Sequence, residues 1–166
     1  MGCLASSTVV RKTSPSVDSR PQSPKNQRYL ALLRKKDLAL FEAIESRKLD
    51  RVKKLCKVAN IEAKYIQGRT PLIGAARSGN IGIVHCLVEQ GGANVNAKDD
   101  NGATAMMIAA RRGHVEKVRY LINQKANVDA TDNDGVTALI WAVRWEHLSV
   151  VIHLVEEGGA SLQLKD

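Results

Sequence analysis

The sequence has few cysteines, few aromatic residues and no long apolar run. Of its 166 residues, 3 are cysteine and 4% are aromatic. The cysteines show neither a paired spacing nor a C-x-x-C zinc pattern, which favours a reducing cytosolic setting over a disulfide framework. The sequence contains no run of about eighteen apolar residues, so it predicts no transmembrane helix. The start has no charged segment before a short, Ser-interrupted apolar stretch, so it does not resemble a secretory signal.

Patterns that would indicate chemistry are also missing. The sequence contains no nucleotide-binding loop, no paired-carboxylate site and no nucleophile with a matching base. We therefore expect no enzymatic activity, no cofactor and no metal. Nucleic acid is only a lesser alternative as a partner for the basic N-terminal residues, because these lack the interleaved aromatic side chains of a stacking platform.

A repeat of about 34 residues is what the sequence does contain. Segments that begin at Gly68, Gly102 and Gly135 align with one another, so the period is 34 and then 33 residues. Self-similarity at this period is typical of stacked units. The aligned columns hold a threonine, a small residue and an alanine that opens the last turn: Thr70, Thr104 and Thr137, then Ala75, Ala109 and Ala142, then Ala93, Ala126 and Ala160.

The copies resemble the ankyrin repeat. Residues 70–75 read Thr-Pro-Leu-Ile-Gly-Ala against the T-P-L-H-x-A motif of that family, and Gly113-His114 matches the Gly-His pair that follows it. The resemblance implies an all-α repeat solenoid, an array of about four helix-turn-helix repeats joined by β-hairpin loops. Each threonine is expected to cap a first helix, and Pro71 suits the first position of one.

Some residues depart from the family pattern. The motif's histidine is replaced by Ile73, Met107 and Ile140, which we expect to pack as apolar side chains. Glu146 stands where a glycine should end a helix with positive φ, which is costly for other residues, so a local adjustment is expected there. His114 and His147 occupy the family's second histidine position, which implies structural hydrogen bonds. Cys56 and Cys86 lie in or beside apolar stripes and are expected in the core.

The chain divides into six expected segments. They are a disordered basic tail (1–25), a helical lead-in with Asn26 as its N-cap (26–36), a degenerate N-terminal capping repeat (37–67), and three repeats (68–101, 102–134 and 135–166). The last repeat is expected to be uncapped, because its outer stripe stays apolar: Val150, Val151, Leu154 and Val155. Two alternatives stay open. Either the chain continues past Asp166, or a partner or a second copy covers this end.

The N-terminus matches an acylation motif. Residues 1–6, Met-Gly-Cys-Leu-Ala-Ser, fit the pattern for N-myristoylation at Gly2, and Cys3 is placed for palmitoylation. Residues 1–36 hold eight Lys and Arg against a single Asp, which accounts for +7 of the formal charge of +8. We expect the chain to be attached to the cytoplasmic face of an anionic membrane, and the plasma membrane is the favoured one. The alternative is a chance motif on a tail whose charges maintain solubility.

The tail also carries two Ser-Pro pairs, at Ser14 and Ser23. Phosphorylation by a proline-directed kinase would subtract about 1.5 to 2 charges at each site and weaken membrane attraction. Since Ser-Pro pairs are common in disordered tails, a tail without such a switch is the alternative.

Partner-binding residues follow from the resemblance, because ankyrin repeats generally bind proteins through their first helices and loop tips. The equivalent positions are rich in arginine near the ends of the first helices and in aspartate at the tips: Arg77, Arg111, Arg112, Arg144 and Trp145, then Asp99, Asp100, Asp132 and Asp134. Arg and Trp are enriched in interface hot spots, and arginines in a row favour an acidic or phosphorylated partner. The alternative is a solvated face that the aspartates neutralise.

The expected function is that of a membrane-anchored adaptor or scaffold that binds a protein. A rival from another class is the substrate-recruiting arm of an enzyme assembly, such as a ubiquitin ligase whose catalytic part lies on another chain or beyond Asp166. The sequence does not indicate an oligomeric state.

Overall fold

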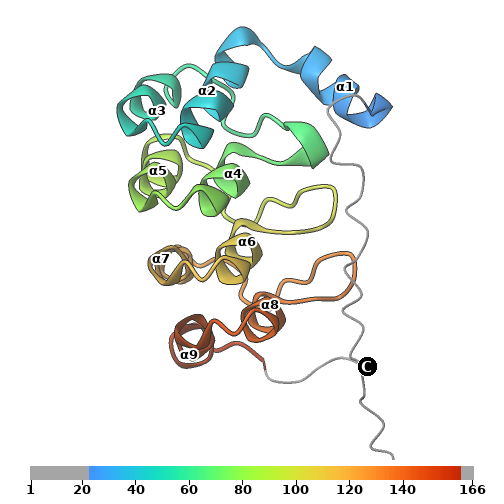
Figure 1. Cartoon of the computed structure of the whole chain (residues 1–166). Coiled ribbons are helices and arrows are strands. Elements are labelled where there is room, and N and C mark those ends of the chain that lie inside the picture. The colour runs from blue at the N-terminus through green and yellow to red at the C-terminus, as the bar shows by residue number, and fades with distance from the viewer. Residues whose placement is uncertain (1–22, 162–166) are drawn as a thin grey trace, which may run out of the picture.

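Two rows of short helices make up the computed structural model, which describes residues 23–161 (Figure 1). One row contains the first helices of the repeats, α2 (Lys35–Glu45), α4 (Pro71–Ser78), α6 (Ala105–Arg111) and α8 (Ala138–Arg144). The second contains α3 (Leu49–Leu55), α5 (Ile81–His85) with its continuation η2 (Cys86–Gln90), α7 (Val115–Asn123) and α9 (Leu148–Glu156). A lead-in helix, α1 (Pro24–Leu32), and a single turn, η1 (Ile66–Gly68), lie at the loop side. The predicted all-α array is confirmed.

The loops between repeats differ in one respect from the prediction. In residues 23–161 they contain no β-strand, so they are turns and not β-hairpins. The second loop is closed by a hydrogen bond from the Asp99 N–H to the Ala103 carbonyl (3.0 Å), and the third by the equivalent bond from Asp132 to Val136 (3.0 Å). These arms are too short for a strand ladder to form.

Threonine caps begin the first helices, as predicted. Each hydroxyl accepts a hydrogen bond from the backbone N–H three residues later: Thr70 from Ile73 (3.4 Å), Thr104 from Met107 (3.4 Å) and Thr137 from Ile140 (3.3 Å). Such a cap typically stabilises a helix by about 1 kcal/mol. Alanines then allow the helices of neighbouring repeats to approach, since Ala75, Ala76, Ala109 and Ala110 are fully buried.

One extra residue distinguishes the 34-residue repeat from the 33-residue one, and η2 accommodates it. The Gly91 N–H donates to the Cys86 carbonyl (3.2 Å), five residues back, which widens the helix into a π turn. A π turn absorbs an insertion without changing the helices on either side. The apolar stripe of the second helix therefore keeps its register with that of the next repeat.

A lysine occupies a core position that the sequence did not mark. Lys117 lies on α7 in the column that holds Ile83 and Val150 in the neighbouring repeats, and its side chain is buried. Its Nζ donates to the carbonyl oxygens of Ala75 (2.8 Å) and Ala76 (3.0 Å) in α4. Burial, with a smaller contribution from a nearby arginine, lowers the pKa of Lys117 to about 8. The ammonium thus joins two repeats across their interface.

The lead-in helix α1 begins earlier than predicted. Its N-cap is Ser23, whose hydroxyl accepts from the Asn26 N–H (3.3 Å), so the prediction of an Asn26 cap and of disorder through residue 25 is wrong. Asn26 is instead buried, and its Oδ1 accepts from the Gln67 N–H (3.0 Å). Pro24 suits the first helical position, which explains the earlier start. Residues 1–22 lie outside the described part of the chain.

Two contacts fix α1 against the tip of the second loop. The Tyr29 hydroxyl donates to Asp100 Oδ1 (2.7 Å), and Lys25 Nζ lies 3.1 Å from Asp100 Oδ2. The hydrogen bond to this carboxylate, together with burial, raises the pKa of Tyr29. The lead-in helix therefore packs on the loops and not on the helices of the first repeat.

The C-terminal repeat has exposed apolar side chains, as predicted, but they are not the residues that were predicted to be exposed. Val150 and Leu154 are fully buried, so their assignment to the outer stripe is wrong. They face the preceding repeat, as their counterparts in α5 and α7 do. Val143 is instead 59% exposed, whereas Ala110, its counterpart in the preceding repeat, is 0% exposed because α8 covers it. The large exposed apolar residues at this end are Val143, Trp145, Leu148 and Ile152.

Cys56 and Cys86 are both buried, as predicted, and their Sγ atoms lie 3.4 Å apart as free thiols. Burial, and then the hydrogen bond to Cys56, raises the pKa of the Cys86 thiol to about 12. The Cys86 thiol is therefore neutral at physiological pH, and both cysteines act as core side chains. Glu146 has a φ of 59°, so it adopts the left-handed conformation that Gly79 and Gly113 have at the same position, at the conformational cost of a non-glycine residue.

Candidate functional site

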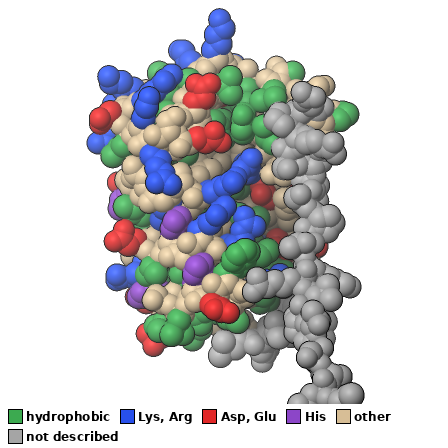
Figure 2. Space-filling view, in the orientation of Figure 1, with side chains coloured by type: hydrophobic (Ala, Val, Ile, Leu, Met, Phe, Trp, Pro, Cys, Tyr) green, Lys and Arg blue, Asp and Glu red, His purple; other side chains and the backbone are tan. Residues whose placement is uncertain are grey.

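Arginines from three successive first helices lie on one face of the array. Arg77, Arg111 and Arg144 occupy the last turns of α4, α6 and α8. Figure 2 shows Lys and Arg side chains grouped at the centre of the visible face, over α4 and α6. The structure also brings an aromatic ring to the row, because the guanidinium carbons of Arg111 and Arg144 lie 5.3 and 5.2 Å from the centroid of Trp141.

The indole of Trp141 is oriented by the loop that precedes α8. Its Nε1–H donates to Asp132 Oδ2 (3.1 Å), while Asp132 Oδ1 accepts from the backbone N–H groups of Val136 (2.8 Å) and Asp134 (3.1 Å). One carboxylate therefore fixes both the loop and the ring. Two cation–π contacts in turn hold two guanidinium groups from adjacent repeats against that ring.

We name this region the Arg–Trp surface, which comprises Arg77, Arg111, Arg112, Arg144, Trp141 and Trp145. Trp145 ends α8 and is 56% exposed, and Arg112 is exposed at the end of α6. None of the four arginines forms an ion pair within 4.0 Å with an acidic residue of the described part of the chain. Neutralisation of this face by direct Arg–Asp pairing is therefore absent among these residues.

Like charges raise the electrostatic potential of the Arg–Trp surface. Burial, followed by the charges of Arg112 and Arg77, lowers the pKa of Arg111, although its guanidinium stays protonated at physiological pH. The pKa of Arg69 is also lowered, first by burial and then by the charge of Arg77. The charge of Asp99 acts in the opposite direction and raises the pKa of Arg111 by a smaller amount. A concentration of positive charge with few internal partners is suited to bind an anionic group.

The four aspartates at the loop tips have different environments. Asp99 accepts from the backbone of Asn101 (2.9 Å) and Ala103 (2.9 Å), and burial raises its pKa. Asp132 holds its own loop and Trp141, and Asp100 binds α1 as described above. The side chain of Asp134 is exposed and takes no part in these contacts. Three of the four predicted contact residues are thus already engaged within the fold.

The two histidines of the repeat motif contact the backbone of the helices that carry the Arg–Trp surface. His147 Nε2 lies 3.1 Å from the Arg111 carbonyl oxygen, and His114 makes a hydrogen bond to the backbone of Arg77. Each ring therefore contacts the last turn of the first helix in the preceding repeat. The structural role that the resemblance implied for these residues agrees with these contacts.

Trp141 is the residue that the sequence did not single out for binding. The sequence predicts Trp145 instead, because it aligns with Arg112 of the preceding repeat and follows Arg144 directly. The available signal was the spacing of Trp141 and Arg144, three residues apart on one helix, which places two side chains on the same face. Gly2, Cys3 and Ser14 lie outside the described residues, and Ser23 is buried as the N-cap of α1.

Comparisons with known proteins identify the repeat. A family model for ankyrin repeats, in three copies, matches residues 22–99 and 74–166. No curated protein gives a significant match. Among residues 23–161, no helix has the length and apolarity needed to cross a bilayer, and no cluster of three or more His, Cys, Asp or Glu side chains could hold a metal.

Proposed function

Because the chain belongs to the ankyrin repeat family, whose repeats serve as scaffolds for protein–protein interaction, we propose that it binds an acidic or phosphorylated protein through the Arg–Trp surface. We further propose that Gly2 and Cys3 carry the lipid groups that hold this non-enzymatic adaptor on the cytoplasmic face of a membrane. The observation that carries the binding proposal is that the guanidinium groups of Arg111 and Arg144 both lie over the Trp141 ring, 5.3 and 5.2 Å from its centroid.

Stacking on Trp141 orients the guanidinium groups of Arg111 and Arg144, in addition to the charge that they provide. An exposed arginine loses considerable side-chain entropy when it binds, and stacking on an aromatic ring restricts the guanidinium in advance. The edge of a stacked guanidinium still presents N–H groups in a plane, and these match the two oxygens of a carboxylate or a phosphate. Two such groups from adjacent repeats can therefore bind two anionic side chains of one partner segment.

Charge reversal of the stacked arginines tests the binding proposal. In the variant Arg111→Glu/Arg144→Glu we expect partner capture to fall at least 100-fold, because each lost contact is of hot-spot size, about 2 kcal/mol or more. The partner is first identified by proximity labelling with the intact chain, and its affinity is then measured with purified proteins. Arg119→Glu/Lys125→Glu, on α7 and in the turn that follows it, changes the net charge equally and is expected to retain binding. Equal affinities for the two double variants would refute the proposal.

Acylation is tested separately from partner binding. Wild-type chain is expected to incorporate alkyne-myristate in cells and to sediment with membranes, whereas Gly2→Ala is expected to do neither. Cys3→Ser should keep the myristoyl label but lose most membrane retention, because a single myristoyl chain binds bilayers only marginally, on the order of 10⁴ M⁻¹. If Gly2→Ala still sediments with membranes and the wild type takes up no label, the anchoring proposal fails.

A further inference from the structure

The N-terminal end of the array is much more basic than the rest. Residues 24–58, which we name the basic cap, contain eleven Lys and Arg against four Asp and Glu, whereas residues 59–161 contain ten against eleven. Figure 2 shows Lys and Arg side chains of this region over α2 and α3 at the top of the molecule. Lys25 and Arg34 form ion pairs, and the other nine cations of the cap form none with described residues. The cap therefore carries a net charge of +7 that the fold leaves largely unpaired.

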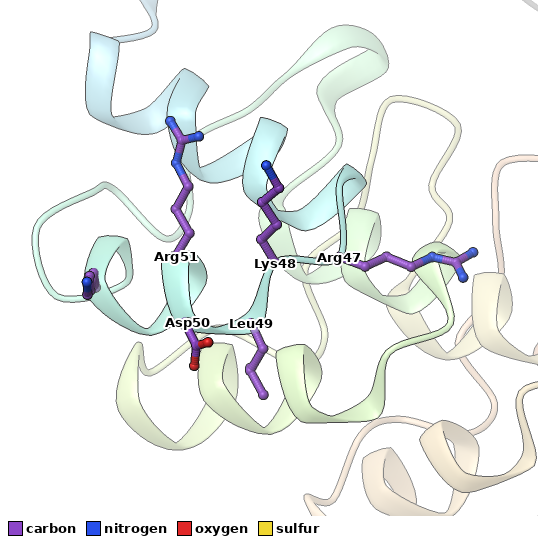
Figure 3. Close-up of a pocket in the computed structure, with 6 residues that line it drawn as sticks. Arg47, Lys48, Leu49, Asp50 and Arg51 are labelled. Carbon is purple, nitrogen blue, oxygen red and sulfur yellow. The ribbon is translucent and has the colours of Figure 1, made fainter.

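An open depression of about 610 Å³ lies in this cap, lined by Arg47, Lys48, Arg51 and Lys54 with Leu49 and Asp50. Figure 3 shows that Lys48 and Arg51 extend to the same side, while the single acidic residue, Asp50, points to the opposite one. Arg47 points in a third direction. These side chains spread outward instead of converging on one point, so they fit an extended anionic surface better than one small anion.

Exposed apolar side chains accompany the positive charge. Leu32 at the end of α1 is 74% exposed, and Val58 after α3 is 49% exposed, with Leu38 of α2 also exposed. Surfaces that combine Lys and Arg with exposed aliphatic residues are typical of proteins that lie on an anionic bilayer, where the charges meet headgroups and the apolar groups enter the interface. An acidic peptide would require the charges but not these apolar groups.

We propose that the basic cap is a membrane-contact surface that binds anionic phospholipid headgroups, with Lys48, Arg51 and Lys54 as principal contacts. This rests on the proposed membrane attachment and extends it from the lipid groups to the folded array. The acylation motif precedes α1 in the chain, so the cap is the folded part nearest to it in sequence. The nearly neutral repeats then extend away from the bilayer, and the Arg–Trp surface on α6 and α8 stays accessible to a partner.

Vesicle binding by the unacylated full chain tests this surface without any lipid anchor. Wild-type protein produced in bacteria is mixed with vesicles of phosphatidylcholine alone or with about 30% phosphatidylserine, and the bound fraction is measured by sedimentation. We expect binding only to the anionic vesicles. Each cation near such a surface contributes roughly fivefold to the partition coefficient, so Lys48→Gln/Arg51→Gln/Lys54→Gln should weaken binding at least tenfold. Leu32→Ser should weaken it several-fold without any change in charge.

The matched control is Lys98→Gln/Arg119→Gln/Lys125→Gln, which removes the same charge from exposed positions of the next two repeats. It is expected to bind within about twofold of wild type, and thermal unfolding verifies that all variants are folded. No binding of wild type to anionic vesicles, or equal losses in the two triple variants, would overturn the proposal. Binding of polyglutamate through Lys48, Arg51 and Lys54 without vesicle binding would overturn it in favour of an acidic protein. None of these outcomes depends on acylation or on the Arg–Trp surface.

Discussion

Gly102→Ala is expected to lower the free energy of unfolding by about 3 kcal/mol, whereas Gly135→Ala is expected to lower it by only about 1 kcal/mol. The two glycines occupy the same column of successive repeats and share a left-handed conformation, with φ of 76° and 74°. An added Cβ at Gly102 would lie 2.5 Å from Asn133 Oδ1 and 2.8 Å from the Asn133 backbone nitrogen. At Gly135 it would meet nothing within 4 Å, because no further loop of the described chain follows.

The pair of variants therefore separates two costs that usually occur together. Gly135→Ala reports the conformational cost of a side chain at positive φ, and the difference between the variants reports the contact between successive loops. Urea unfolding followed by circular dichroism measures both. Similar values for the two variants would show that the loops are not stacked as described.

Lys117→Ala is expected to destabilise the chain by about 2 to 4 kcal/mol, because it leaves a cavity where three methylenes and the ammonium packed and removes the two hydrogen bonds to α4. Lys117→Met keeps most of the packing and also removes a charge that burial disfavours. These effects oppose each other, so its stability should stay within about 1 kcal/mol of wild type at pH 7. Chemical unfolding of the three proteins at pH 7 gives the comparison.

The pH dependence of stability isolates the buried ammonium. Below pH 8 Lys117 is protonated in both states, and the cost of burying its charge is fully present. Between pH 8 and the ordinary value of 10.5, the unfolded chain holds a proton that the folded chain has released, so the free energy of unfolding rises with pH. We expect a rise on the order of 1 to 3 kcal/mol in wild type relative to Lys117→Met. Parallel pH profiles would contradict this assignment.

The architecture was predictable because its determinants are local and repeated. A threonine before each first helix and alanines at each close approach recur at a fixed interval, so several copies indicate the same packing. Glu146 was recognisable for the same reason, since a residue that breaks a column is visible against the others. The loops were harder to predict, because the turn and the hairpin have the same residues at the tip and differ in whether the arms are long enough to pair.

The features that were missed depend on contacts between repeats. Lys117 interrupts an apolar column, and only the distance from Nζ to the carbonyls of α4 explains how its charge is accommodated. The ring of Trp141 binds Arg111 of the preceding repeat, so its role depends on the stacking geometry as well as on its own helix. The basic cap is not apparent from the charge of residues 1–36, because many of its cations belong to α2 and α3 and are brought together with those of α1 only by the fold.

The docking of α1 determines how the array would respond to tension applied at its N-terminus. Because Lys25 and Tyr29 bind Asp100, and Asn26 binds Gln67, a pull at Ser23 loads the loops of the first two repeats together. These three attachments act in parallel and share the force, so they resist it better than attachments that break one after another. If the N-terminal segment were joined directly to α2, without α1, the same force would instead act on α2 alone and separate it from the first repeat. We therefore expect the lead-in helix to protect the first repeat from a force applied at Ser23.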